Sequence, residues 1–213
     1  MDTEAEAHDY DAMDHVAVNG RFCQDFLTHS PPLDRVVDVG TGTARIPIEL
    51  CRRAPEARVT GVDLAAHMLA LAEKNVADAG LSDRITLERV DAKGLPHASG
   101  SFGGVICNTI LHHIEDPRPA LAEMLRVLRP GGVLFVRDLV RPETDEAVAE
   151  LVGKHAAHDT PGQRALFEAS LRASFTLEEI RAIVAPLGVP AEAVSPTSDR
   201  HWTLAHRASQ APS

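Results

Sequence analysis

The sequence predicts an α/β fold in which a mostly parallel sheet carries helices on both faces. Residues 36–39 and 59–62 are apolar, strand-like runs, and they are separated by two glycines and a stretch of helix-forming composition at 43–53. An acidic residue lies at the end of each of the first three strands, at Asp38, Asp63 and Asp91. Parallel strands bring their carboxyl ends to one edge, so these carboxylates are expected to line a common polar pocket.

The glycine turn after the first strand predicts a site for a nucleoside-bearing cofactor. Gly40 and Gly42 allow a ligand to approach the backbone closely, and the following helix offers unpaired N–H groups at its start. Asp63 follows the turn by roughly 20 residues, where a carboxylate can accept two hydrogen bonds from a ribose diol. Asp38 would repel the pyrophosphate of a dinucleotide, whereas it suits the ammonium and sulfonium groups of S-adenosylmethionine.

The run from Asp38 to Ala44, Asp-Val-Gly-Thr-Gly-Thr-Ala, resembles motif I of class I S-adenosylmethionine-dependent methyltransferases, with Ala44 in place of the third glycine. The resemblance continues at 91–96, 108–117 and 128–134, and it is to small-molecule enzymes such as those of ubiquinone and menaquinone biosynthesis. It implies a Rossmann-like, seven-stranded, mostly parallel sheet with an N-terminal helical lid and a helical insert after the fifth strand. It also implies in-line transfer of a methyl group from S-adenosylmethionine to an O, N, S or C nucleophile of a small molecule.

The resemblance implies a set of cofactor contacts. Asp63 would bind the ribose hydroxyls, Asp91 the adenine amine, and the backbone at Asn108 the methionine moiety. Met68 is near the adenosine in the family, although its spacing is equally typical of a core residue. The full set of expected cofactor contacts is Asp38, Gly40, Thr41, Gly42, Asp63, Leu64, Met68, Asp91, Ala92 and Asn108.

Two histidines and an aspartate are the candidate general bases. His112 and His113 follow the fourth strand, and Asp138 follows the fifth strand at the same edge of the sheet. One of them would accept the proton of a hydroxyl or protonated amine acceptor, whereas a thiol or carboxylate acceptor needs no base. The alternative is that the histidines only pack and bond their own loop.

Three further residues are candidates for contacts with the acceptor. Tyr10 belongs to the N-terminal segment that covers the pocket in the family, and Arg137 and Arg141 flank the end of the fifth strand. Charges at a strand end are also typical of a solvated loop, so both interpretations of the arginines stay open.

The remaining elements follow from periodicity and from breaker residues. Pro31 and Pro32 end the first helix, Gly80 ends the third in a left-handed cap, and Thr176 begins a later one as N-cap. Gly103 replaces the aspartate usual in the family, and local packing is expected to differ there. The predicted order is helix 16–27, strand 36–39, helix 43–53, strand 59–62, helix 65–79, strand 84–90, strand 104–107, helix 121–128, turn 130–132, strand 133–136, helices 143–158 and 162–174, a helix after residue 176, and an antiparallel pair at 194–196 and 201–206.

These elements predict a single domain of 213 residues. Within it, residues 1–30 form the lid, 31–140 the cofactor-binding core, 141–174 the helical insert and 175–207 the C-terminal part of the sheet. No repeat or linker divides the chain.

Composition narrows the partners. The net charge of −10 disfavours nucleic acid, which requires clustered Lys and Arg, and no run approaches the roughly 20 apolar residues of a membrane span. The three cysteines, Cys23, Cys51 and Cys107, lack metal-type spacing and are expected to be buried thiols; no metal site is expected. A cytoplasmic protein acting on a small molecule is predicted, and the oligomeric state stays open.

Three other functions remain open. A nicotinamide-dependent oxidoreductase is disfavoured by Asp38 and by the lack of a Tyr-x-x-x-Lys pair, because Tyr10 is the only tyrosine. The chain could also bind S-adenosylmethionine without transferring a methyl group, as a sensor or partner subunit. Finally, it could use the sulfonium for a reaction other than methylation, because motif I does not distinguish these reactions.

Overall fold

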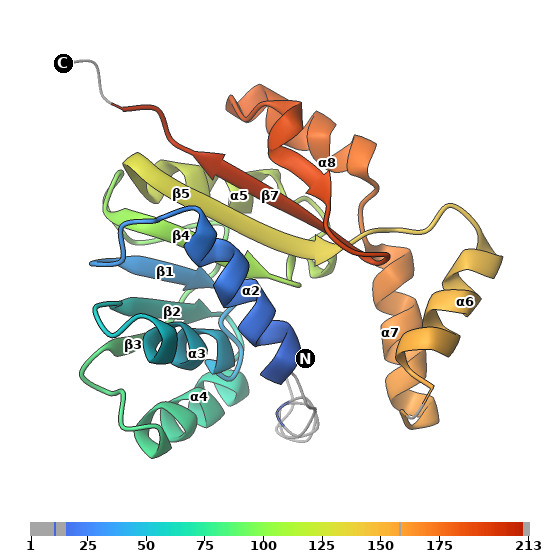
Figure 1. Cartoon of the computed structure of the whole chain (residues 1–213), viewed down its shortest axis with the longest axis horizontal. Coiled ribbons are helices and arrows are strands. Elements are labelled where there is room, and N and C mark those ends of the chain that lie inside the picture. Colours follow the sequence, from blue (N-terminus) through green and yellow to red (C-terminus); the bar gives the residue numbers. More distant parts are fainter. Residues whose placement is uncertain (1–10, 12–15, 158, 211–213) are drawn as a thin grey trace. The chain divides into compact units, whose positions relative to one another are not determined.

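The computed structural model describes residues 11, 16–157 and 159–210 (Figure 1). Seven strands form one sheet in the order β3-β2-β1-β4-β5-β7-β6. The strands are β1 (Val36–Val39), β2 (Val59–Asp63), β3 (Ile85–Arg89), β4 (Phe102–Asn108), β5 (Leu128–Leu139), β6 (Val194–Pro196) and β7 (His201–Arg207). The predicted α/β fold class, with its seven-stranded and mostly parallel sheet, is confirmed.

The helices alternate with these strands along most of the chain. They are α2 (Val16–Thr28), α3 (Arg45–Arg53), α4 (Ala66–Asp78), α5 (Arg118–Val127), α6 (Asp145–His155), α7 (Pro161–Ala173) and α8 (Leu177–Val184), with short 3-10 helices η1 (Leu111–His113), η2 (Ala185–Leu187) and η3 (Ala191–Ala193). The chain divides into two compact units. Unit 1 comprises residues 1–108, 119–135 and 206–213, and unit 2 comprises 109–118 and 136–205.

Unit 1 contains the parallel strands that position the glycine turn. β1 pairs with β2 on one side and with β4 on the other, and all four residues of β1 are buried. A strand hydrogen-bonded on both sides and buried on both faces explains the continuous apolar run in the sequence. The pairing aligns Val39 with Val62, so the segments after β1 and β2 leave the sheet at the same edge.

Helix α2 covers part of unit 1 and lies beside α3 (Figure 1). The Phe22 and Phe26 side chains are fully buried, and their ring centroids lie 5.1 Å and 5.9 Å from that of Phe135 in β5. Burial of each ring stabilises the fold by about 1.5–3 kcal/mol. The described part of the N-terminal segment is therefore a packed helix of the core.

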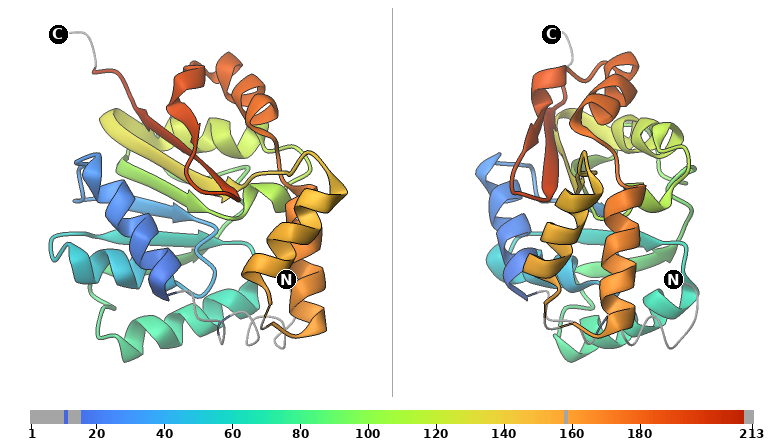
Figure 2. Two further views of the ribbon diagram at one scale, coloured as in Figure 1. Left: turned by 45° about the vertical axis from the view of Figure 1, so that its right-hand side comes forward. Right: turned by 90° about the vertical axis from the view of Figure 1, so that its right-hand side faces the viewer.

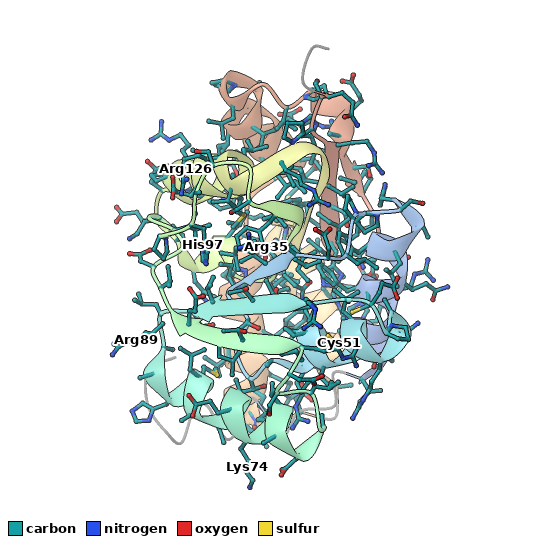
Figure 3. The ribbon with its side chains drawn as sticks, turned by 90° about the vertical axis from the view of Figure 1, so that its left-hand side faces the viewer. Arg35, Cys51, Lys74, Arg89, His97 and Arg126 are labelled. Atoms are coloured by element: carbon teal, nitrogen blue, oxygen red, sulfur yellow. The ribbon has the colours of Figure 1, made fainter. Side chains whose placement is uncertain are left out.

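A polar network fixes the entry to β4 within unit 1. Figure 3 shows Arg126, His97 and Arg35 in this region. Arg126 donates a 2.8 Å hydrogen bond to the His97 carbonyl, and the His97 ring packs edge-on against Phe102 with 4.9 Å between centroids. The Arg35 guanidinium lies 5.2 Å from the centroid of the same ring. These contacts hold the segment before β4 against the start of the sheet.

Gly103 has a packing reason that explains its departure from the family pattern. A Cβ at this position would lie 2.6 Å from both the Cβ and the carbonyl oxygen of Pro32. An aspartate cannot fit beside this backbone without a shift. The next residue, Gly104, is similarly restricted, because its Cβ would meet Phe26 Cζ at 2.8 Å.

Unit 2 contains the helical insert after β5, as predicted. Helices α6 and α7 run alongside each other (Figure 2), and they bury Val148 and Leu171 against Leu139 at the end of β5. Thr176 caps α8 as predicted: its hydroxyl accepts the Glu179 N–H at 3.2 Å, and the Glu179 carboxylate accepts the Thr176 N–H at 2.9 Å. The predicted antiparallel pair of β6 and β7 is also confirmed.

The start of β5 was predicted wrongly. Residues 130–132 were assigned to a turn after a helix ending at 128, whereas the helix ends at Val127 and the strand begins at Leu128. Gly131 adopts a φ of 74°, its N–H donates to the Ala208 carbonyl, and the Gly132 carbonyl accepts the Ala208 N–H, both at 3.0 Å. A partner about 75 residues away in the chain thus extends the strand through a sequence that locally favours a turn.

Two smaller expectations concern burial and membrane spans. Cys23, Cys51 and Cys107 are buried, as predicted, and none of them forms a disulfide. Among the described residues, no helix combines the length and apolarity that crossing a bilayer requires.

Candidate functional site

The glycine turn after β1 is built from left-handed residues. Gly40 and Gly42 adopt φ values of 77° and 54°, and Ala44, at the position of the third glycine, adopts 62°. This conformation costs a residue with a Cβ about 1–2 kcal/mol. The Gly40 and Thr41 N–H groups both donate to the Val62 carbonyl, at 2.8 Å and 3.0 Å, which ties the turn to β2.

Asp38 is the buried carboxylate of this turn, with 1% of its surface exposed. Within the described residues, neither carboxylate oxygen has a hydrogen-bond partner, and the buried hydroxyls of Thr41 and Thr43 also have none. Burial raises the pKa of Asp38 to about 7, because it outweighs the opposing effect of the nearby Thr41 hydroxyl, and the charge of Asp63 adds a smaller increase. Unsatisfied buried polar atoms are rare in folded proteins, so this group fits a ligand that supplies positive charge and hydrogen-bond donors.

Asp63 joins the end of β2 to the glycine turn. One carboxylate oxygen accepts the Gly42 N–H at 2.8 Å, and the other accepts the Ala65 N–H at 2.9 Å. Each carboxylate oxygen can accept a second hydrogen bond, so both keep a lone pair for a further donor. The neighbouring Leu64 side chain is exposed, whereas Met68 in α4 is buried in the core.

Asp91 lies in the loop that follows β3. The Val90 N–H donates to the Asp63 carbonyl at 2.9 Å, which places this loop beside the end of β2. The Asp91 carboxylate accepts the N–H of Lys93 at 2.9 Å, and about half of its side chain remains exposed. Ala92 follows it, and Asn108 is the last residue of β4, in the same unit.

A clasp around the start of α3 was missed by the sequence analysis. Arg45 donates two hydrogen bonds, at 2.9 Å and 2.7 Å, to the two carboxylate oxygens of Asp11. The Asn75 amide bridges Asp11 and the Thr43 carbonyl, at 3.1 Å and 3.0 Å. The residues of these pairs are 32 to 64 positions apart in the chain, so no local sequence pattern predicts the contacts. Tyr10, the predicted lid contact, lies outside the described residues.

Asp138 is the buried carboxylate of unit 2, and all its hydrogen bonds are made inside that unit. One oxygen accepts the N–H groups of Leu111 and His112, at 2.7 Å and 3.3 Å. The other accepts the Leu139 N–H at 2.7 Å and lies 2.6 Å from His112 Nδ1. The carboxylate therefore selects the His112 tautomer with a proton on Nδ1, and it leaves Nε2 as the acceptor.

His113 stacks beside His112, with 4.0 Å between ring centroids. Partial desolvation and the neighbouring His112 lower the pKa of His113 to about 4, so its ring is neutral at pH 7. The structure thus brings together the three predicted base candidates, His112, His113 and Asp138.

The two predicted acceptor-binding arginines have partners within the protein. The Arg137 side chain is buried, and its Nε donates to the Thr203 hydroxyl at 2.9 Å. Arg141 forms an ion pair with Glu179 and donates to the Ser174 carbonyl, which ties the start of α8 to the end of β5.

Residues 36–132 match a protein family described as a methyltransferase domain. This segment of the chain, slightly less than half of its length, is therefore similar to a methyltransferase domain. Both the resemblance drawn from motif I and the expected cofactor, S-adenosylmethionine, are thereby confirmed. The matched segment contains every predicted cofactor residue, from Asp38 to Asn108, and it ends before Asp138.

Curated methyltransferases are similar to this chain in sequence, and a solved structure is similar to it in fold. A demethylmenaquinone methyltransferase of Porphyromonas gingivalis is 37% identical over 57% of this chain and 48% of its own length. One from Deinococcus radiodurans is 41% identical over 54% of this chain and 46% of its own length. The chain thus spans about half the length of these relatives. The structure of an S-adenosylmethionine-dependent methyltransferase from Aquifex aeolicus aligns over 97% of this chain and 99% of that one, with 16% identity and a TM-score of 0.69, which shows that the two chains share a fold.

Proposed function

We propose that this chain transfers a methyl group from S-adenosylmethionine to a small-molecule acceptor. The observation that carries the proposal is the buried Asp38 carboxylate, which has no hydrogen-bond partner among the described residues and lies in a glycine turn. A cationic cofactor compensates this carboxylate, whereas a pyrophosphate would add a like charge. The methyltransferase domain and the names of the curated relatives support the same reaction.

The cofactor contacts proposed here all lie in unit 1. Asp38, with Thr41 beside it, holds the positively charged end, and the lone pairs of Asp63 accept the ribose hydroxyls. Leu64 offers an exposed apolar side chain to the adenine, and Asp91 accepts its exocyclic amine. The remaining contacts are assigned by resemblance to Gly40, Gly42, Met68, Ala92 and Asn108.

For the acceptor, we propose that His112 and Asp138 work as a pair in unit 2. When bound, S-adenosylmethionine supplies an already activated methyl group, so the protein mainly has to orient the acceptor and remove its proton. Asp138 stabilises the imidazolium that forms when His112 Nε2 accepts this proton. The neutral ring of His113 accepts a hydrogen bond and orients the acceptor.

The proposed acceptor class rests on the net charge of the chain and on the names of its curated relatives. The net charge of −10 favours a small molecule over nucleic acid, and buried thiols suit the reducing cytoplasm. The relatives named for demethylmenaquinone make a hydroxylated aromatic ring a reasonable first acceptor to test.

The test is an acceptor screen that measures formation of S-adenosylhomocysteine by mass spectrometry. The panel contains a naphthoquinol, catechols, amines and thiols, and D38N serves as the variant with impaired cofactor binding. We expect product formation that depends on one acceptor class and falls in D38N. Binding of S-adenosylmethionine with no turnover of any acceptor would instead identify a binding protein without transferase activity.

A further inference from the structure

Arg200 directly precedes β7 in unit 2, and its backbone is hydrogen-bonded to the residue that follows β5. Its carbonyl accepts the N–H of Val140, the residue after β5, at 2.9 Å, and its own N–H donates to the Ser198 hydroxyl at 3.2 Å. These two hydrogen bonds fix the position of the Arg200 backbone independently of its side chain.

The guanidinium of Arg200 is stacked on an aromatic ring. Its Cζ lies 5.8 Å from the centroid of Phe167 in α7. Phe167 is anchored in turn, because it packs against the buried cluster of Leu139, Val148 and Leu171. Helix α7 also contacts η1, the 3-10 helix that contains His112 and His113. The arginine is thus stacked on a helix that contacts the element carrying the two histidines.

This arginine differs from its neighbours in having no ion pair within the described part of the chain. Arg141 pairs with Glu179, and Arg172 pairs with Asp145 and Glu168. The one acid next to Arg200, Asp199, binds Lys154 at 2.7 Å and His155 at 2.9 Å.

The Arg200 side chain is also partly buried. Burial lowers the pKa of its guanidinium, and Asp199 offsets only part of this effect. Burial and the positive charges of Arg200 and Arg137 lower the pKa of His201 to about 4, so His201 is neutral at pH 7. A half-buried cation that lacks a bound anion is destabilised. The planar guanidinium of Arg200 can donate two parallel hydrogen bonds to a carboxylate.

We propose that Arg200, stacked on Phe167, binds a carboxylate group of the methyl acceptor. This inference rests on the proposed function and assigns the acceptor a substrate class, an acid in which the carboxylate is the anchor rather than the methylated atom. Arg200 and Phe167 both lie beyond residue 132, where the match to the family ends. The specificity would therefore be a property of this chain's own C-terminal part.

A pair of fluorinated probes tests the proposal without any turnover. Binding of 4-fluorobenzoate and of its neutral analogue 4-fluorobenzamide is measured by ¹⁹F NMR, with the protein saturated with S-adenosylhomocysteine. We expect the wild type to bind the benzoate about tenfold or more tightly than the amide, since only the acid forms charge-assisted hydrogen bonds. Equal binding of the two probes, or no binding of the benzoate, would overturn the proposal even if no variant folded.

Three variants locate the effect. Arg200→Gln should weaken benzoate binding about tenfold or more, and Arg200→Lys, which keeps the charge but not the fork, should weaken it less. Arg164→Gln removes an exposed charge from the same helix as Phe167 and should change nothing. Unchanged benzoate binding in a folded Arg200→Gln variant would contradict the proposal. Affinity for S-adenosylhomocysteine is measured separately. If the proposed function is wrong, the wild type should not bind S-adenosylhomocysteine.

Discussion

Asp38 in β1 and Asp138 in β5 are equally buried, each with 1% of its surface exposed, yet their surroundings are opposite. Asp138 accepts three backbone N–H groups and contacts the His112 ring. Asp38 has no partner for either oxygen among the described residues, and its pKa is raised to about 7. A carboxylate that is hydrogen-bonded within the protein fixes the position of its neighbours. A buried carboxylate without such hydrogen bonds is instead suited to bind a ligand.

The difference comes from the local backbone rather than from the residue type. The N–H groups of η1 turn toward Asp138, so the loop after β4 is organised around it. The glycine turn after β1 instead directs its N–H groups to Val62 and Asp63, which leaves Asp38 without donors. Substitutions that remove charge should therefore have opposite effects on stability at the two sites.

The Asp138→Asn substitution is expected to have the largest effect, which is a loss of catalysis. The asparagine cannot accept all the hydrogen bonds of the carboxylate or stabilise a charged His112, so we expect kcat to fall about 10²–10⁴-fold. The unfolding free energy should fall by about 1–3 kcal/mol for each donor left unsatisfied. The assay uses the acceptor found in the screen, and NMR of the His112 ring reports its tautomer. An unchanged kcat and an unchanged tautomer would show that Asp138 is not a positioning residue.

Asp38→Asn should weaken binding of S-adenosylmethionine about 10–100-fold while stabilising the free protein at pH 8. The pKa of Asp38 rises from its usual 3.8 to about 7 on folding, so the ionised form is disfavoured in the native state. The wild type therefore loses stability from this group as the pH rises from about 4 through about 7, and the asparagine removes this loss. Urea unfolding at pH 5 and pH 8 measures the difference. A variant that is less stable than the wild type at pH 8 would contradict the account.

Asp63→Ala should lower cofactor affinity by about 1.5–3 kcal/mol, the usual cost of losing charged hydrogen bonds. It also leaves the Gly42 and Ala65 N–H groups without their acceptor, so Asp63→Asn provides the comparison that keeps one acceptor oxygen. Calorimetric titration with S-adenosylhomocysteine measures both variants. Wild-type affinity in a folded Asp63→Ala protein would remove Asp63 from the cofactor site.

Gly103→Ala should have the smallest effect, a loss of about 1–3 kcal/mol of stability with unchanged cofactor affinity. The new Cβ would lie 2.6 Å from Pro32, whereas a Cβ at Gly153, inside α6, would meet no atom within 4 Å. Gly153→Ala is therefore the matched control, and it should stabilise the protein by about 0.5–1 kcal/mol. Thermal unfolding of both variants tests the contrast, and a neutral Gly103→Ala would show that Pro32 can move.

Elements with a strong local pattern could be predicted from the sequence. The glycine turn, the flanking strands and the Thr176 cap depend on residues close together in the chain, and each was found within a few positions. The start of β5 depends on Ala208, and the Asp11 clasp depends on Arg45 and Asn75, so neither had a local signal.

The candidate site shows the same division. Asp38, Asp63, His112, His113 and Asp138 were predicted from motifs and from strand ends, but their hydrogen bonds were not. Arg200 was missed altogether, because nothing near it in the sequence reveals that it stacks on Phe167, 33 residues earlier. The ion pair of Arg141 likewise depends on a residue 38 positions away.

The most direct test of the contrast between the two aspartates is calorimetric titration of the protein with S-adenosylmethionine at pH 6 and pH 8, with NADH as the control ligand. The account predicts binding of S-adenosylmethionine that is tighter at pH 8, because Asp38 is then ionised before the ligand arrives, and no binding of NADH. In Asp38→Asn the dependence on pH should disappear. Binding of NADH alone, or an affinity for S-adenosylmethionine that is equal at both pH values, would contradict the assignment of Asp38 as the group that binds the cationic cofactor.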